Sequence, residues 1–240
     1  MIELGESKID SCLANLKVGV VVPAAGSGQR MEGEPKQFLQ LAGQPVLQHV
    51  LNLFLGYSWV KDMVVALPKK QFEERPLWLN QYPKVRGVLG GATRRDSVWN
   101  AVQILSEDLD LVVVHDAARP LTSQKTILDC VKNASEGPGA VAGVRVVDTL
   151  KTADKTNQVL ETLERKGVWK AQTPQVFAYD VFLDAYHKAI RHDWIANDDS
   201  TIVEKAGGQV RMVESSVLNF KITFPADLEL AEAVLTRYRS

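Results

Sequence analysis

The chain has 240 residues, of which 45% are hydrophobic and 24% charged, and its formal net charge is −1. These values are ordinary for a globular protein, so they exclude a disordered or fibrous chain and the broad basic field of a nucleic-acid-binding protein. No stretch reaches eighteen consecutive apolar residues and the N-terminus is acidic, so we expect a cytoplasmic protein with no nucleic-acid or membrane partner.

Short apolar runs alternate with helical patterns over the first half of the chain, after an N-terminal extension at 1–17 to which we assign no role. This order predicts an α/β fold with a mostly parallel, Rossmann-like sheet covered by helices on both faces. Strands are expected at 18–22, 63–67, 85–89 and 111–115, with helices at 45–55 and 97–105. Because ligands of such sheets collect at the carboxyl ends of strands, we expect the functional residues there.

The second half of the chain is expected to complete a single domain that spans 18–240. After an apolar run at 140–147, the polar stretch 148–166 is interpreted as a protruding β-arm, which extends over about 145–168. Further helices are expected at 181–190, from Asn197 and from Pro225, and further strands at 209–213 and 217–223. We find neither an internal repeat nor a clear linker, which favours one domain with an inserted arm.

The first predicted strand leads into a loop of small residues, Pro23-Ala24-Ala25-Gly26-Ser27-Gly28-Gln29-Arg30-Met31. Small residues let backbone N–H groups surround an anion, so we interpret the loop as a phosphate cradle, with a tight ligand-free turn as the alternative. The loop lacks the Gly-Lys-Ser/Thr of a Walker A motif and the third small residue of a dinucleotide fingerprint. The second strand also ends without an acidic residue that could hold a ribose, so an oxidoreductase is disfavoured.

Two cations bracket this loop, Arg30 and Lys36, and Pro35 stiffens the chain before the second of them. Nucleotidyl transfer needs such cations, because charge builds on the phosphoryl oxygens and on the departing pyrophosphate. Solvated surface cations are the alternative that these residues leave open.

The fourth predicted strand ends in His115-Asp116-Ala117-Ala118-Arg119-Pro120. Asp116 is a candidate Mg²⁺ ligand, because magnesium prefers one or two protein carboxylates together with substrate phosphates. Arg119 is a candidate for the phosphate of a second substrate, and His115 is expected to be packed. Capping of the turn before the next helix is the alternative role for Asp116.

The third predicted strand is followed by Gly90-Gly91 and then by Asp96-Ser97. This backbone-rich loop leaves room for a flat base to lie against the main chain. A simple turn with a helix N-cap explains the same residues, and the two interpretations stay open.

Taken together, the motifs resemble the methylerythritol-phosphate cytidylyltransferase family over about residues 18–237. The matching motifs are Pro23-Ala24-Ala25-Gly26-x-Gly28-x-Arg30-Met31, Pro35-Lys36-Gln37-Phe38, Gly90-Gly91, Asp96-Ser97-Val98, His115-Asp116-Ala117-Ala118-Arg119-Pro120, Asp148-Thr149, Thr173-Pro174-Gln175 and Asn219-Phe220-Lys221-Ile222-Thr223. Several independent motifs in one order are far more specific than a single glycine-rich loop.

This resemblance implies a nucleotidyltransferase fold, a homodimer and a divalent cation, Mg²⁺, as cofactor. It implies that CTP and 2-C-methyl-D-erythritol 4-phosphate react to give 4-diphosphocytidyl-2-C-methyl-D-erythritol and pyrophosphate, a step of non-mevalonate isoprenoid biosynthesis.

The resemblance also implies roles for individual residues. The triphosphate would lie against Ala24, Ala25, Gly26 and Gly28, and the cytosine against Gly91 and Ser97. The catalytic residues would be Arg30, Lys36, Lys221 and Arg165. Asp116 would hold the metal and contact substrate, and the methylerythritol phosphate side would include Arg119, Thr149, Arg165 and Thr173. The arm that carries Thr149 and Arg165 would reach into the partner subunit's site.

Three residues depart from the family pattern: Gln29 replaces a frequent basic residue, Ala92 an acidic or polar one, and Asn197 a Thr or Ser. The departure at Ala92 affects how the cytosine base would be recognised, and the departure at Asn197 affects a local contact with the substrate.

A polyol-phosphate cytidylyltransferase acting on ribitol 5-phosphate is the nearest alternative, and a nucleotide-binding sensor without turnover is the non-enzyme alternative. We favour methylerythritol phosphate because Ala24-Ala25 precedes Gly26, Ala118 precedes Arg119, and the arm offers a cation at Arg165.

Overall fold

The structure, a computed structural model, describes residues 13–26 and 35–239. Its centre is a seven-stranded sheet with the strand order β11-β7-β10-β6-β1-β4-β5. The strands are β1 (Val18–Pro23), β4 (Val60–Leu67), β5 (Val85–Leu89), β6 (Leu111–Val114), β7 (Gly139–Arg145), β10 (Trp169–Ala178) and β11 (Val210–Glu214). Only β10 runs antiparallel to its neighbours β6 and β7, so the prediction of a mostly parallel sheet is confirmed.

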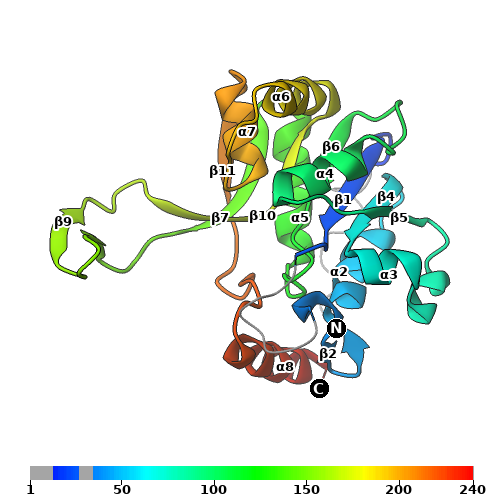
Figure 1. The fold of residues 1–240 in the computed structure, drawn as a ribbon, viewed down its shortest axis with the longest axis horizontal. Helices are drawn as coiled ribbons and strands as arrows, with labels where there is room; N and C mark the ends of the chain where they lie inside the picture. The colour runs from blue at the N-terminus through cyan, green and yellow to red at the C-terminus, as the bar shows by residue number, and fades with distance from the viewer. Residues whose placement is uncertain (1–12, 27–34, 240) are drawn as a thin grey trace.

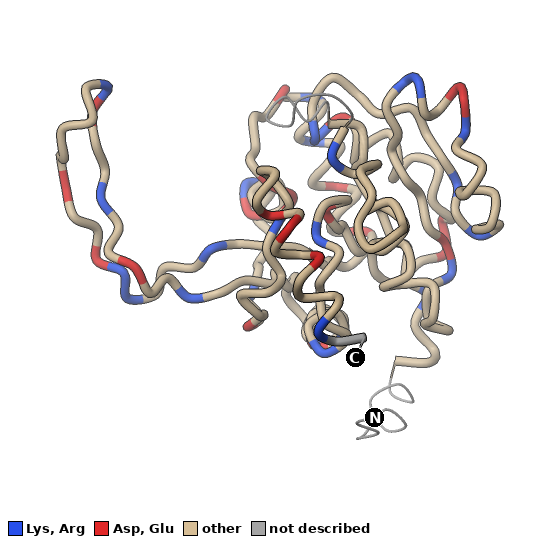
Figure 2. Tube along the Cα trace, turned by 90° about the horizontal axis from the view of Figure 1, so that it is seen from below, with Lys and Arg blue, Asp and Glu red and all other residues tan. Residues whose placement is uncertain are grey.

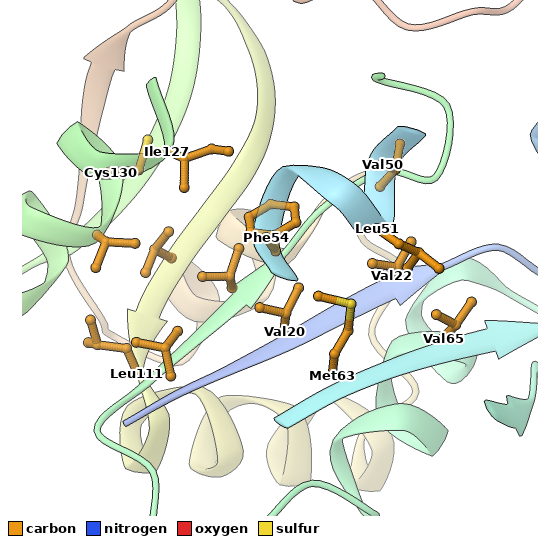
Figure 3. Close-up of a cluster of buried hydrophobic side chains, with 14 of the residues drawn as sticks. Val20, Val22, Val50, Leu51, Phe54, Met63, Val65, Leu111, Ile127 and Cys130 are labelled. Carbon is orange, nitrogen blue, oxygen red and sulfur yellow. The ribbon is translucent and has the colours of Figure 1, made fainter. Parts of the chain in front are cut away.

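Helices cover both faces of this sheet, as predicted (Figure 1). One face carries α2 (Val46–Leu55) and α5 (Gln124–Ser135), and the other carries α4 (Arg94–Val102), α6 (Tyr179–Arg191) and α7 (Asp199–Lys205). Alternate residues of a strand point to opposite faces, so Val20 and Val22 pack against Phe54 of α2, whereas Val21 lies in the core of the opposite face. Figure 3 shows the first of these clusters, with α2 lying over β1 and β4.

Smaller elements complete the body of the molecule. They are the 3-10 helices η1 (Lys36–Phe38) and η2 (Leu77–Gln81), the hairpin strands β2 (Gln40–Leu41) and β3 (Gln44–Pro45), and the helices α3 (Lys69–Glu73) and α8 (Pro225–Arg239). A third, small core joins α8 to the hairpin through Ala231, Leu41 and Ile222. Among the described residues, no helix has both the length and the apolar character that a membrane crossing demands.

The predicted arm is present as a hairpin of β8 (Leu150–Ala153) and β9 (Val159–Leu163), which pair antiparallel to each other. It continues β7 and leads into β10, and it projects away from the body in Figure 1. Residues 151–167 are all exposed. Acidic and basic residues both occur along the arm, as the coloured trace in Figure 2 shows. The arm therefore has almost no packing partner within its own chain.

Some predicted boundaries are wrong. Residues 217–223 form a loop and not a strand, because no strand lies beside them and the loop is fixed instead by Asn219 and by a hydrogen bond from Ile222 N to Ala118 O. Helix α4 begins three residues before the predicted Ser97, since Thr93 is its N-cap in a capping box with Asp96. Strand β10 was not predicted at all.

Candidate functional site

A pocket of about 530 Å³ opens at the carboxyl ends of β1, β5 and β6. Its walls come from segments 23–26, 36–37, 91–97, 116–118 and 221–223. Loops of parallel strands meet at one edge of a sheet, so segments far apart in the sequence surround one space.

Most of the predicted pocket residues are brought together there. The pocket is lined by Ala24, Ala25, Gly26, Lys36, Gly91, Ser97, Asp116 and Lys221. Gly28 and Arg30 lie outside the described residues, as does Gln29. Ala92 also lines the pocket, and Asn197, the other departure from the family pattern, is exposed before α7.

Asp116 is surrounded by cations from three segments. Its Oδ2 atom lies 3.1 Å from Lys221 Nζ and 3.2 Å from Arg119 Nε, and its Oδ1 atom lies 3.5 Å from Arg94 Nη2. Burial raises the pKa of this carboxyl, but the three cations outweigh burial and hold the pKa well below its usual range. Asp116 is therefore a carboxylate at any physiological pH.

The loop that carries Lys221 is fixed by polar contacts on both sides. Arg119 Nη1 donates to the carbonyl of Asn219 at 2.7 Å, and the buried Asn219 side chain donates to the carbonyl of Thr173 at 2.9 Å. Thr122 donates to Asn219 Oδ1 at 2.6 Å. These contacts hold the extended loop across the end of the sheet, where Lys221 reaches Asp116.

His115 and Thr173 lie behind Asp116 and support its backbone. The Thr173 hydroxyl accepts a hydrogen bond from Asp116 N at 2.9 Å and lies 3.2 Å from His115 Nδ1. His115 Nε2 lies 3.1 Å from the carbonyl of Arg119, which can only accept, so the proton belongs on Nε2. Burial lowers the pKa of His115 to about 4, so the ring is neutral. The prediction that His115 is packed is confirmed, since its exposed fraction is 0%.

Thr173 is only 3% exposed and does not line the pocket. Its contact with the second substrate stays a prediction, as does that of Arg119, which lies beside the pocket and donates to Asp116. Sequence reasoning assigned Thr173 through its motif, but the hydroxyl is occupied by His115 and Asp116.

Gln37 holds the small-residue loop and was not singled out from the sequence. Its buried side chain donates to the carbonyls of Ala24 and Gly26, the second at 3.1 Å. These bonds set the direction of the backbone at the pocket wall. The sequence feature that could have identified Gln37 is its position directly after Lys36, in a motif that already contained a predicted site residue.

The Gly90-Gly91 loop packs tightly against the first loop. A Cβ atom added at Gly90 would lie 2.0 Å from Ala25 Cβ, so only glycine fits there. The Ser97 hydroxyl donates to the carbonyl of Thr93 at 2.9 Å and accepts from Gly91 N at 3.1 Å. Ser97 thus fixes the Gly90-Gly91 loop against the start of α4. This geometry fits both interpretations of the loop, as a wall for the base and as a turn before a capped helix.

Arg94 is the main pocket residue that the sequence did not reveal. It lies between Asp116 and Asp199, with Nη2 2.7 Å from Asp199 Oδ2. Burial lowers its pKa, but the two carboxylates outweigh burial and hold the pKa above its usual value. A recognised capping box at Thr93 and Asp96 would have placed Arg94 at a helix start on the pocket edge.

Thr149 and Arg165, two further predicted residues, lie on the arm and not at the chain's own pocket. Both are exposed, Thr149 just before β8 and Arg165 just after β9, and Arg165 donates to the carbonyl of Val147. They therefore sit at the base of the arm.

The donor set of the pocket suits a divalent cation only together with phosphate oxygens. Among the described residues no group of three or more His, Cys, Asp or Glu side chains could hold a metal. Asp116 lines the pocket as a single ionised carboxylate. One carboxylate suffices for Mg²⁺ when substrate phosphates supply further ligands, so the residues fit a metal that arrives with a triphosphate.

Comparisons with known proteins point to one family. The family model for 2-C-methyl-D-erythritol 4-phosphate cytidylyltransferase matches residues 18–237. Proteins of that name from Pelotomaculum thermopropionicum and Halalkalibacterium halodurans are 42% and 38% identical, covering 91% and 92% of this chain and 94% and 97% of their own. A crystal structure of the protein of that name from Thermus thermophilus superposes with a TM-score of 0.79 at 33% identity, covering 92% of this chain and 100% of its own.

Proposed function

The chain belongs to the 2-C-methyl-D-erythritol 4-phosphate cytidylyltransferase family, and on that premise we propose how its pocket performs the transfer. The chain is a cytidylyltransferase that joins the cytidylyl group of CTP to 2-C-methyl-D-erythritol 4-phosphate in isoprenoid biosynthesis. A phosphate oxygen of the alcohol phosphate forms a bond to the α-phosphorus of CTP, while the bond to the β-phosphate breaks and pyrophosphate leaves. The observation that carries the proposal is the convergence of Lys36, Asp116 and Lys221 on the small-residue loop.

In this proposal the triphosphate lies along the backbone of residues 24–26, and the cytosine lies against the Gly91 wall. Lys36 and Lys221 oppose the negative charge that grows on the phosphoryl oxygens and on pyrophosphate during transfer. The low-exposure floor formed by Ala117 and Ala118 supports this role, because charge pairs act more strongly where water is excluded. Arg30 is assigned to the same task from its motif alone.

We propose that Asp116 holds a Mg²⁺ ion that enters with CTP. When bound, such an ion neutralises phosphate charge and orients the triphosphate. The low pKa of Asp116 supports this role, because the ligand is ionised before the metal arrives.

We further propose a cytoplasmic homodimer in which Thr149 and Arg165 act in the partner's pocket on the methylerythritol phosphate side. The exposure of Leu160 and Val159 on the arm, 68% and 52%, supports a partner there. Arg119 and Thr173 are assigned to the same substrate from the family pattern.

The test is to offer the purified protein each of the four nucleoside triphosphates with 2-C-methyl-D-erythritol 4-phosphate and Mg²⁺, and to measure pyrophosphate. We expect release with CTP and little with the other three. Ribitol 5-phosphate is run in parallel, and faster turnover of it would replace the assigned substrate. No release with any pair would favour a nucleotide-binding sensor.

A further inference from the structure

Arg94 is shared unequally between two carboxylates. Its Nη2 atom lies 2.7 Å from Asp199 Oδ2 and 3.5 Å from Asp116 Oδ1. Asp199 Oδ2 has no partner with hydrogen-bond geometry, so the shorter contact is an ion pair. The Arg94 side chain keeps 28% of its surface exposed toward the pocket, whereas the Asp199 side chain has none.

Asp199 is anchored in the body by several contacts. Tyr186, a fully buried residue of α6, donates to Asp199 Oδ1 at 2.5 Å. The start of α7 is held by Gln175 of β10, which accepts from Ser200 N at 2.9 Å and donates to Asp198 Oδ2 at 2.8 Å. Asp199 is therefore held in place within the body, whereas Arg94 is the partly exposed member of the pair.

The two oxygens of Asp116 differ in what surrounds them. Oδ2 is engaged by Lys221 and Arg119 at 3.1 and 3.2 Å. Oδ1 faces Arg94 at 3.5 Å, beyond a charge-assisted hydrogen bond. Among the described side chains, Oδ1 is thus the carboxylate oxygen with room for a further cation, and Arg94 is the residue that would close it.

We propose that Asp199 is a positioning residue for the reaction: it draws Arg94 away from Asp116 Oδ1 and so keeps that oxygen available to a divalent cation. This inference rests on the proposed metal role of Asp116. A neutral side chain at position 199 leaves the half-buried guanidinium with Asp116 as its remaining ion-pair partner. Opposite charges attract strongly where water is scarce, so Arg94 then moves onto Oδ1 and competes with the cation.

The test compares Asp199→Asn with the unchanged protein in binding of Mn²⁺, measured by the electron paramagnetic resonance signal of the free ion. CTP is present at a concentration that saturates each variant, and the alcohol phosphate is left out so that no turnover occurs. We expect Asp199→Asn to bind Mn²⁺ about tenfold more weakly, the scale of one coupled charge pair. The concentration of Mg²⁺ for half-maximal turnover should rise by the same factor.

Asp184→Asn is the control, since Asp184 is an exposed carboxylate of α6 that pairs with Lys188 and does not hold the start of α7. We expect its Mn²⁺ affinity to be unchanged. The double variant Arg94→Gln/Asp199→Asn removes the competing cation as well, and we expect it to bind Mn²⁺ at least as tightly as the unchanged protein. It also keeps the experiment decisive if Asp199→Asn folds poorly, because neutralising both partners leaves no unpaired buried charge.

The outcomes separate the two proposals. Unchanged Mn²⁺ affinity in Asp199→Asn overturns the positioning role, and so does a double variant as weak as the single one, or a matching loss in the Asp184→Asn control. Absence of Mn²⁺ uptake by the unchanged protein with CTP overturns the metal role of Asp116 itself, together with the inference that rests on it.

Discussion

Asp116 draws together side chains that are far apart in the sequence. Its own place at the end of a strand could be predicted, because loops after parallel strands share one edge of the sheet. Its partner Lys221 was assigned through a motif, while the strand predicted around Lys221 was wrong. Arg94 was not predicted, because its role depends on two carboxylates that only the fold brings near it. Its Nη2 atom lies 2.7 Å from Asp199 Oδ2 and 3.5 Å from Asp116 Oδ1.

Lys221→Ala is expected to lower kcat about 100-fold, or ~2.7 kcal/mol of transition-state stabilisation. The affinity for CTP should change far less, because the charge that Lys221 opposes grows towards the transition state. Steady-state kinetics and calorimetric binding of CTP check both values. The control Lys132→Ala changes an exposed lysine of α5 and should leave kcat alone. A Lys221→Ala protein with nearly full turnover would refute the role.

Cys130 is expected to resist alkylation in the folded protein across pH 7 to 9. Its side chain has 0% exposure, and burial raises its pKa to about 12, so the thiolate that reacts is scarce below that pH. Iodoacetamide labelling of the Cys12→Ser protein, followed by mass spectrometry, measures the rate at which Cys130 is alkylated. Labelling should be fast only in denaturant. Rapid labelling at pH 8 without denaturant would contradict the burial of the thiol.

Elements with continuous apolar runs were the most predictable. The strands at 18–22 and 111–115 and the helix at 45–55 were found to within a residue, because their apolar residues are buried in the two main cores. Strand β10 was missed because it contains Pro174 and because polar residues break the apolar pattern of its first half. At 217–223 a strand was predicted where the structure has a loop, because the apolar residues of this segment pack into the small core beside α8 and not within a sheet.

Gly90→Ala is expected to destabilise the protein by about 1–3 kcal/mol, the usual cost of overpacking, and to weaken CTP binding. The added methyl would meet Ala25 Cβ at 2.0 Å and push the two loops of the pocket apart. Gly56→Ala is the matched control, because nothing lies within 4 Å of its added methyl. It should be neutral or stabilising by up to about 1 kcal/mol. Urea unfolding of both variants distinguishes them, and equal stabilities would count against the close approach.

At the scale of the whole molecule, the body buries its apolar residues on both sides of the sheet, whereas the arm buries almost nothing. The polar composition of 148–166 predicted this contrast, because such a stretch cannot form a core of its own. Composition could not identify a partner surface for the arm, since in the proposed homodimer that surface would belong to another molecule.

Mixing Arg165→Ala with Lys36→Ala protein is expected to restore part of the activity that each has lost. If the arm acts in the partner's pocket, a mixed dimer contains one pocket with both residues intact. The measurement is pyrophosphate release after subunit exchange, with exchange verified by native mass spectrometry of differently tagged chains. Mixed dimers without any regained activity would show that Arg165 does not act across the interface.

The loop of Lys221 also has a consequence for how the protein is made. All seven strands of the central sheet precede this residue in the chain, and Ile222 is held by the small core that α8 completes. A growing polypeptide on the ribosome can therefore finish the sheet while Lys221 is still unplaced. On the role proposed for Lys221, we expect catalytic competence to be acquired late in synthesis, after the scaffold that supports it.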